Sequence, residues 1–154
     1  MSKLEFQKVD EKKTSVSKPY NVRERKIKDA PYRELINADL AQELYFKIKE
    51  KIVVQKKYKE PNYLAKDLAR ELNTNTRYVS AVINSRFGMN YSSLINEYRV
   101  KDAIQMLLDY RFATKSIEEI SALAGFANRQ SFYSAFYKAT GGSPNEYRKQ
   151  HGRK

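Results

Sequence analysis

The chain has 154 residues, no Cys, and 30 Lys and Arg side chains against 18 Asp and Glu, which gives a formal net charge of +12. This length suffices for one domain with a core or for two very small ones, and the lack of Cys excludes disulfides and thiolate metal sites. So basic a balance favours a polyanionic partner, with nucleic acid first and a membrane surface second. No apolar run approaches the roughly 20 residues that span a membrane, and no signal-peptide pattern opens the chain. We therefore expect a cytoplasmic protein with no membrane partner.

The first part of the chain predicts a flexible arm followed by a helix. Residues 1–36 are basic, contain two Pro residues and lack sustained apolar periodicity, which is typical of disorder. From Leu40 to Ile52 an apolar residue recurs at every fourth position, as on a helix that faces a core. Lys56 and Lys57 then fall in an expected loop.

The next segments indicate two short helices. Residues 63–72 are expected to form a helix that points Leu64, Leu68, Ala69 and Leu72 inward. A second helix is expected over 76–86. Gly88 should follow the second of these helices, because Gly readily adopts the left-handed conformation just past a helix end.

The second half of the chain predicts four more helices. A long one over 91–109 has a broad apolar face. Ser116 and Glu119 have the spacing of a capping box, which predicts a short helix from there. A helix over 129–140 follows, and the run "SPNEYRKQ" begins the last one, with Ser as N-cap and Pro at the first helical position. No strand pattern is seen.

The chain repeats itself internally. The run "KDLARELNTN…YVSAVINSRFG" superposes on "EEISALAGFAN…SFYSAFYKATG", with Leu68 matching Ile120. Each copy has the pattern of helix, tight turn and helix, and such a duplication in a basic protein indicates two helix-turn-helix units. Gly125 in one turn and Asn73 in the other are expected at positive φ, which these residue types tolerate best.

The outward face of the expected helix over 129–140 carries groups that suit DNA better than water. In a helix-turn-helix, the second helix lies in the major groove and reads base edges. Arg129 could form a forked contact with guanine and Gln130 one with adenine. The expected base-contacting residues are Thr76, Arg77, Ser80 and Ala81 in the first unit and Arg129, Gln130, Tyr133 and Ser134 in the second. The expected phosphate-contacting residues are Lys56, Lys57, Asn84, Arg86, Lys115, Asn128, Tyr137 and Lys138.

The remaining aromatic residues and one Arg have simpler interpretations. Phe126, Phe132, Phe136 and Tyr147 are expected in the core. Arg99, in the long helix, is expected to pair internally in preference to contacting DNA.

The runs "LAKDLARELNTNTRYVSAVINSRFGMNYSSLINEYRVKDAIQMLL" (64–108) and "IEEISALAGFANRQSFYSAFYKATGGSPNEYRK" (117–149) resemble the DNA-binding domain of the AraC/XylS transcription regulators. The resemblance implies an all-α, homeodomain-like fold of two helix-turn-helix subdomains joined by a long linker helix. It also implies a bacterial regulator that reads double-stranded DNA by placing helices 76–86 and 129–140 in successive major-groove segments, with RNA polymerase as a further candidate partner. A monomer is expected to suffice, because the two units are tandem copies. The expected organisation is an arm (1–36), a first subdomain (37–90), the linker helix (91–109), a second subdomain (110–150) and a tail (151–154).

Three positions depart from the family pattern. Ala81 and Ser134 stand where the family often has a basic residue, and Ser121 where it usually has Ala. The resemblance therefore implies that base readout depends more on Arg77, Arg129 and Gln130.

Other classes of function fit the sequence less well. An enzyme is disfavoured because there is no Gly-rich phosphate loop, no plausible triad and no carboxylate pair in apolar surroundings, and no metal or cofactor is expected. A basic module for RNA or protein lacks the aromatic platform of common RNA-binding folds, and A-form RNA hides its major groove from a helix. The DNA-binding output fragment of a larger signalling protein stays open as an alternative.

Overall fold

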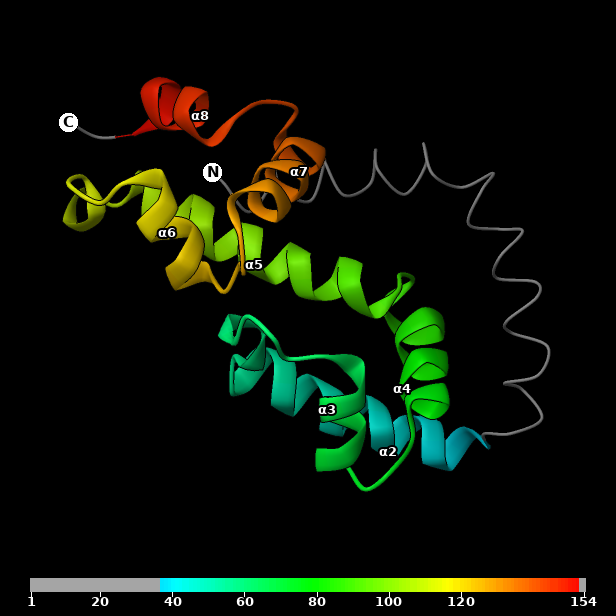
Figure 1. The fold of residues 1–154 in the computed structure, drawn as a ribbon. Coiled ribbons are helices and arrows are strands. Elements are labelled where there is room, and N and C mark those ends of the chain that lie inside the picture. Colours follow the sequence, from blue (N-terminus) through cyan, green and yellow to red (C-terminus); the bar gives the residue numbers. More distant parts are fainter. Residues whose placement is uncertain (1–36, 153–154) are drawn as a thin grey trace. The chain divides into compact units, whose positions relative to one another are not determined.

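The computed structural model describes residues 37–152; the predicted arm and the last two residues of the predicted tail lie outside them. The described residues form seven α-helices and no strand, which confirms the predicted all-α fold (Figure 1). The helices are α2 (Ala38–Lys49), α3 (Ala65–Glu71), α4 (Thr76–Val82), α5 (Tyr91–Leu108), α6 (Ile117–Ala124), α7 (Arg129–Thr140) and α8 (Pro144–His151). Shorter turns are the π-helical η1 (Glu50–Val54) and η3 (Ile83–Phe87) and the 3-10 turns η2 (Lys57–Lys59) and η4 (Tyr110–Phe112).

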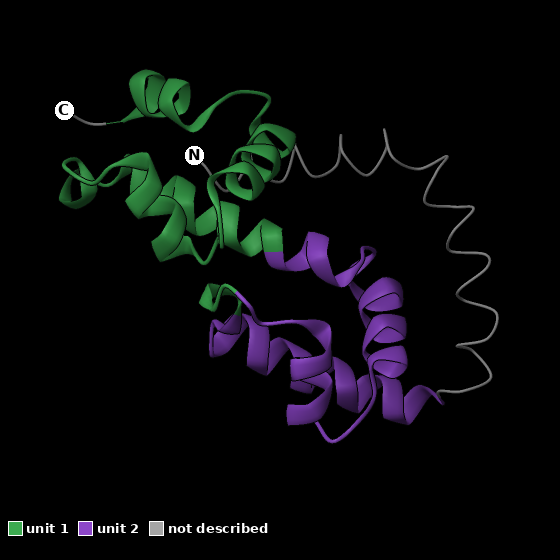
Figure 2. Cartoon of the chain, in the orientation of Figure 1, with its two compact units in different colours: residues 1–16, 58–61, 96–154 green, residues 17–57, 62–95 purple. Residues whose placement is uncertain are grey.

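The described residues fall into two compact units (Figure 2). One unit, here unit 2, contains 37–57 and Asn62–Ile95, and the other, unit 1, contains Tyr58–Pro61 and 96–152. The boundary falls inside α5, so the helix predicted as a separate linker contributes residues to both units.

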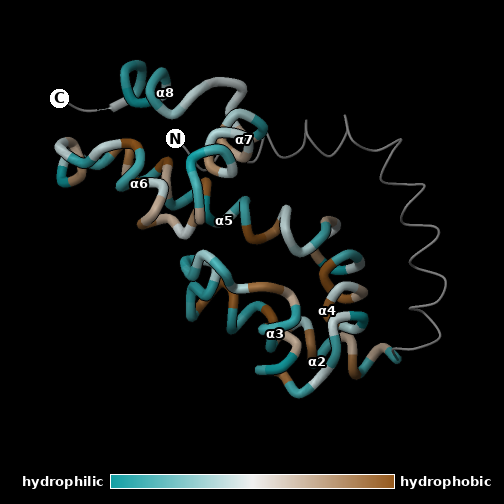
Figure 3. Tube along the Cα trace, viewed as in Figure 1, coloured by the Kyte–Doolittle hydropathy of each residue, from teal (hydrophilic) through white to brown (hydrophobic). Residues whose placement is uncertain are grey.

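Unit 2 holds the first helix-turn-helix, formed by α3 and α4. Hydrophobic stretches of α2 and α4 alternate with hydrophilic ones along the chain, as expected of helices with one buried face (Figure 3). The turn between α3 and α4 contains Asn73 at φ 55°, which confirms its predicted positive φ. The buried apolar residues of this unit include Leu44, Ile48, Ile52, Leu68, Val79, Val82, Ile83, Leu94 and Ile95.

Two predictions about unit 2 need correction. Leu64 does not face inward: it is the N-cap residue of α3 and is 50% exposed, because α3 begins at Ala65 and not at Tyr63. The helix predicted over 76–86 is α-helical only to Val82 and continues as η3, before Gly88 ends it in the predicted left-handed conformation.

Unit 1 holds the second helix-turn-helix, formed by α6 and α7. The predicted capping box is present: the Glu119 N–H donates to Ser116 Oγ at 3.0 Å, and the Ser116 N–H donates to the Glu119 carboxylate at 2.7 Å. Gly125 ends α6 with φ 108°, which confirms the predicted turn. The core is formed by Val100, Ala103, Ile104, Leu107, Ile117, Ile120, Ala124, Phe126, Phe132, Phe136 and Ala139, with Tyr147 packed against it.

The Tyr58–Pro61 segment is fastened inside unit 1 by Arg99. This side chain is only 9% exposed, and its guanidinium donates to the Tyr58 carbonyl oxygen at 2.6 Å and to the Glu60 carbonyl oxygen at 2.9 Å. The internal pairing predicted for Arg99 is therefore confirmed. The Tyr58 hydroxyl donates to the Asp102 carboxylate at 2.7 Å, and burial together with this hydrogen bond raises the pKa of Tyr58 above its usual value.

Candidate nucleic-acid interface

Helix α7 begins and ends with defined caps. The Asn128 side chain accepts from the Ser131 N–H at 2.8 Å, and Gly141 ends the helix with φ 80°. Three side chains of α7, those of Phe132, Phe136 and Ala139, are buried in unit 1. The exposed residues of the helix are Arg129, Gln130, Ser131, Ser134, Tyr137 and Lys138. The predicted outward face is thus open, with an Arg and a Gln in its first turn.

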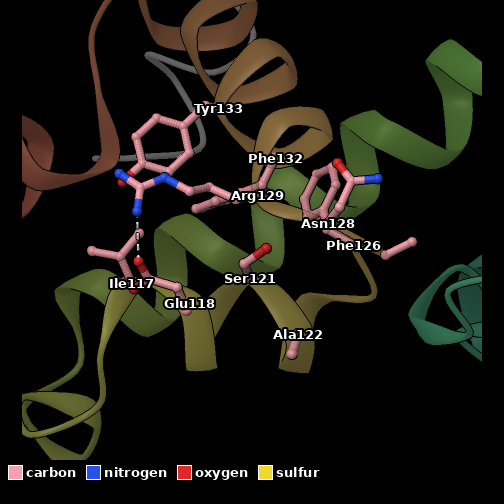
Figure 4. A pocket seen from close by; sticks show the side chains of 10 residues that line it. Ile117, Glu118, Ser121, Ala122, Phe126, Asn128, Arg129, Phe132 and Tyr133 are labelled. Atoms are coloured by element: carbon pink, nitrogen blue, oxygen red, sulfur yellow. Dashed lines mark hydrogen bonds and ion pairs between the residues drawn. The ribbon is translucent and has the colours of Figure 1, made fainter.

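The guanidinium of Arg129 is held by two neighbours. Its Nη1 donates to Glu118 Oε1 at 2.9 Å, and the group lies 4.6 Å from the ring centroid of Tyr133 (Figure 4). Both partners of the ion pair are largely exposed, at 64% for Arg129 and 57% for Glu118. The guanidinium of the side chain expected to read guanine thus has an acidic neighbour and an aromatic neighbour.

Tyr133 is half-buried rather than fully outward. Its ring packs edge-on against Phe132, and its hydroxyl oxygen is buried with no hydrogen-bond partner among the described residues. A base contact from this hydroxyl would require the residues that cover it to move, so this role stays a prediction.

A small hollow lies between α6 and α7. Its volume is about 110 Å³, and it is lined by Ile117, Glu118, Ser121, Ala122, Phe126, Ala127, Asn128, Arg129, Phe132 and Tyr133 (Figure 4). Pockets for drug-sized ligands have volumes of roughly 300–1,000 Å³. The hollow is too small for a ligand of that size and lies between α6 and the N-terminal end of α7.

In unit 2, fewer of the residues predicted to face outward on α4 are exposed than expected. Asn75 caps α4 by accepting from the Tyr78 N–H at 3.0 Å, and Thr76 and Arg77 are exposed in the first turn. Ser80 is half-buried. Ala81 is only 7% exposed, so its predicted outward position is wrong. It packs with the core side of α4, one residue along the helix from Val82.

Some of the expected phosphate-contacting residues are engaged within the protein. The Arg86 guanidinium donates to Gln42 Oε1 at 2.7 Å and lies over the ring of Tyr45. The Asn84 amide donates to the backbone carbonyl of Ser80 at 2.8 Å.

Lys56 and Lys57 of unit 2 differ in their exposure. Lys57 is part-buried, with Nζ 3.9 Å from the Glu71 carboxylate. Lys56 is exposed and has a φ of 55°. In unit 1, the exposure that a phosphate contact requires is found at Lys115, Asn128, Tyr137 and Lys138.

The partners of Arg129 and Arg148 were not predicted from the sequence. Glu118 lies 11 residues before Arg129, across the turn, so neither helical spacing nor a local motif pairs them. Arg148 of α8 was likewise missed: its guanidinium donates to the Lys115 and Phe112 carbonyl oxygens at 2.8 and 3.0 Å and holds the loop before α6. Only the repeat, by placing α6 against α7, could have suggested the first of these pairs.

Two other kinds of site are absent from the described residues. They contain no group of three or more His, Asp or Glu side chains that could hold a metal ion. No helix of 37–152 is long and apolar enough to cross a membrane.

Two tandem helix-turn-helix units with exposed polar first turns define a DNA-binding class of protein. A family profile described as a helix-turn-helix domain matches residues 68–150, more than half of the chain. The chain belongs to this family, the AraC-type helix-turn-helix proteins, which confirms the resemblance seen in the sequence.

Similar proteins include regulators that are much longer than this chain. The chain is 31% identical over 84 residues to an uncharacterized HTH-type transcriptional regulator, YtdP, of Bacillus subtilis; the match covers 54% of this chain and 10% of that protein. It is 31% identical over 83 residues to the melibiose operon regulatory protein of Escherichia coli, covering 54% of this chain and 26% of the relative. The chain therefore corresponds to a fraction of each relative.

Solved structures share the fold over most of their own length. The C-terminal domain of AraT, a response regulator from Geobacillus stearothermophilus, is 28% identical with a TM-score of 0.61, over 70% of this chain and 87% of that one. A protein of unknown function from Listeria innocua is 27% identical with a TM-score of 0.60, over 68% and 93% of the two chains.

Proposed function

We propose that the protein is a sequence-specific transcription regulator that binds double-stranded DNA by inserting helices 76–86 and 129–140 into successive major-groove segments. The observation that carries the proposal is the first turn of α7, where Arg129 and Gln130 are exposed on a helix that its Phe side chains fix to a core. Membership of a helix-turn-helix family implies double-stranded DNA as the partner. The same membership supports a non-enzymatic role, since transcription regulators of this kind act by binding.

Charge supports a partner along the whole chain and not at one end. The net charge is +12, and exposed Lys residues flank both helix-turn-helix units, as with Lys56 in one and Lys115 and Lys138 in the other. Each phosphate that such a cation neutralises releases a counterion, so binding should weaken steeply with salt.

The proposed site on DNA has two boxes read by one monomer. Helix α5 has 18 residues and is thus about 27 Å long at 1.5 Å per residue. Once the flanking helices are added, this length is commensurate with the roughly 34 Å between major-groove positions one turn apart. We therefore expect boxes about 10 base pairs apart, centre to centre.

Selection of duplexes from a random pool by the purified protein tests the proposal. Recovery of an asymmetric two-box motif is expected, with protection of both boxes in footprinting. Inserting about 5 base pairs between the boxes turns one of them to the opposite side of the duplex and should reduce binding to what one box supports. Recovery of no motif, or equal competition by structured RNA, would contradict sequence-specific DNA recognition.

A second candidate is that this chain is the DNA-binding part of a larger signalling system. The relatives are longer than the matched region, which is 10% of one and 26% of another. A similar structure is the C-terminal domain of a response regulator. RNA polymerase is a further proposed partner, and its recruitment to a promoter carrying the selected boxes would be measured by co-binding with and without this protein.

A further inference from the structure

We propose that Glu118 is a positioning residue for DNA recognition. It holds the guanidinium of Arg129 over the ring of Tyr133, so that unit 1 meets DNA with this side chain already oriented. The proposal rests on the proposed function and deepens it, because it assigns part of the base specificity to a residue of α6, outside the helix that is proposed to enter the groove.

Three neighbours fix Arg129 in place. It is the first residue of α7, directly after the N-cap Asn128, so its backbone is held by the cap. One of its terminal nitrogens donates to Glu118 Oε1 at 2.9 Å, and its guanidinium lies 4.6 Å from the Tyr133 ring centroid (Figure 4). A guanidinium has five N–H donors in a planar fork. The single bond to Glu118 therefore leaves further donors for a base edge.

The supports of Arg129 are themselves anchored. The ring of Tyr133 meets that of the fully buried Phe132 edge-on, with centroids 5.8 Å apart and planes at 86°. Glu118 lies in the first turn of α6, whose start is fixed by the Ser116–Glu119 capping box. The guanidinium thus has a fixed ring on one face and a fixed carboxylate at one edge.

The ion pair is suited to orienting Arg129 and not to withholding it from DNA. At 64% and 57% exposure the pair is open to solvent, and surface pairs of this kind change an equilibrium by about five-fold at most. A forked contact with guanine discriminates by roughly 5–150-fold. A pair this weak can therefore orient Arg129 without preventing the base contact that its remaining N–H donors make.

Orientation favours the correct site over others. A long side chain that is ordered beforehand loses less freedom when it binds. The carboxylate also offsets one positive charge near the phosphates, which weakens sequence-independent attraction. The effect on phosphate attraction acts on every duplex alike, so the ordering of Arg129 is what raises the ratio of specific to non-specific affinity.

The test compares Glu118→Gln with Glu146→Gln, which removes an exposed carboxylate from α8 of the same unit. Affinities for the selected two-box duplex and for an unrelated duplex are measured by fluorescence anisotropy at fixed salt. We expect the ratio of the two affinities to fall about 3–10-fold in Glu118→Gln, with weaker binding to the selected duplex and equal or tighter binding to the unrelated one. Glu146→Gln should leave the ratio within about two-fold of wild type.

The same substitution in an Arg129→Ala background separates positioning from other roles of Glu118. There Glu118→Gln should leave the ratio unchanged, because the side chain that it positions is gone. Glu118→Asp, which keeps the charge but draws it back by one methylene, should lower the ratio in the wild-type background. Thermal melting should change little, since an exposed pair adds little stability, and this shows that the variants are folded.

The outcomes are distinguishable. A ratio that is unchanged or higher in Glu118→Gln, or that falls equally in the Arg129→Ala background, would overturn the positioning role while the wild-type protein keeps its preferred duplex. A wild-type protein with no preference for any duplex would overturn the proposed function itself.

Discussion

Replacing Gly125 with Ala should destabilise unit 1 much more than the same replacement at Gly141. Both residues have positive φ, at 108° and 80°, so an Ala at either carries a conformational cost of about 1–2 kcal/mol. Only at Gly125 would the new Cβ meet other atoms: it would lie 2.5 Å from the Tyr58 carbonyl oxygen and 2.8 Å from the Lys59 Cα, whereas nothing lies within 4 Å at Gly141.

The atoms that the new Cβ meets cannot yield cheaply. They belong to the backbone, and the Tyr58 carbonyl oxygen already accepts from Arg99 Nε at 2.6 Å. Forced overpacking of this kind costs about 1–3 kcal/mol. Gly125→Ala should therefore lose roughly 2–5 kcal/mol and Gly141→Ala roughly 1–2 kcal/mol of unfolding free energy.

Urea unfolding followed by circular dichroism measures both losses on the same protein. In thermal melts, each kcal/mol corresponds to about 4–8 °C for a unit of 60–100 residues. Equal destabilisation by the two substitutions would refute the argument, because it would mean that the Tyr58–Pro61 segment does not press on the turn.

Four further predictions concern other contacts. Arg99→Ala leaves two backbone carbonyls without their donor and should cost about 2–5 kcal/mol of unfolding free energy, measured by urea unfolding. A hydrogen bond from the Ser116 N–H lowers the pKa of Glu119. The stability that the Glu119 carboxylate contributes is therefore present above the unfolded pKa of about 4.5 and should be lost as the pH falls below it. Thermal melts of Glu119→Gln as a function of pH should not show this loss of stability. Arg129→Ala should weaken binding to the selected site by about 1–3 kcal/mol and relax one or two base positions, seen on a panel of altered duplexes. Lys56→Ala should weaken binding equally on all sequences and reduce the salt slope by about one unit, and identical behaviour of these last two variants would contradict the division between base and phosphate contacts.

Much of the fold could be predicted because its signals are local. The capping box at Ser116, the turn at Gly125 and the fourfold apolar spacing from Leu44 to Ile52 each depend on residues a few positions apart. The repeat then placed the two helix-turn-helix units. The errors at Leu64 and Ala81 arose where one residue of register decides between core and surface, since α3 starts after Leu64 and α4 turns Ala81 inward.

The site was predictable only in part, because its electrostatics depend on contacts between distant positions. The exposed cations of α7 follow from helical spacing, but the pair of Arg129 with Glu118 crosses a turn. The pairing of Lys57 with Glu71 and that of Arg86 with Gln42 join different elements of unit 2. A count of charges along the chain treats all of these cations as equally available to phosphate, and the structure separates them.

Unit 1 is not continuous in the sequence, because it includes the Tyr58–Pro61 segment as well as the residues from Asn96 onward. A single continuous fragment that begins after this segment would therefore lack part of the unit. The family match begins at residue 68, so a gene fragment cut there would encode Arg99 without the two carbonyl oxygens that receive its guanidinium. During synthesis on the ribosome, the Tyr58–Pro61 segment emerges well before α5 to α8. Its carbonyl oxygens therefore lack the Arg99 guanidinium until α5 has been made. Recombination that exchanged unit 1 between relatives would therefore have to carry along four residues that precede α3 in the sequence.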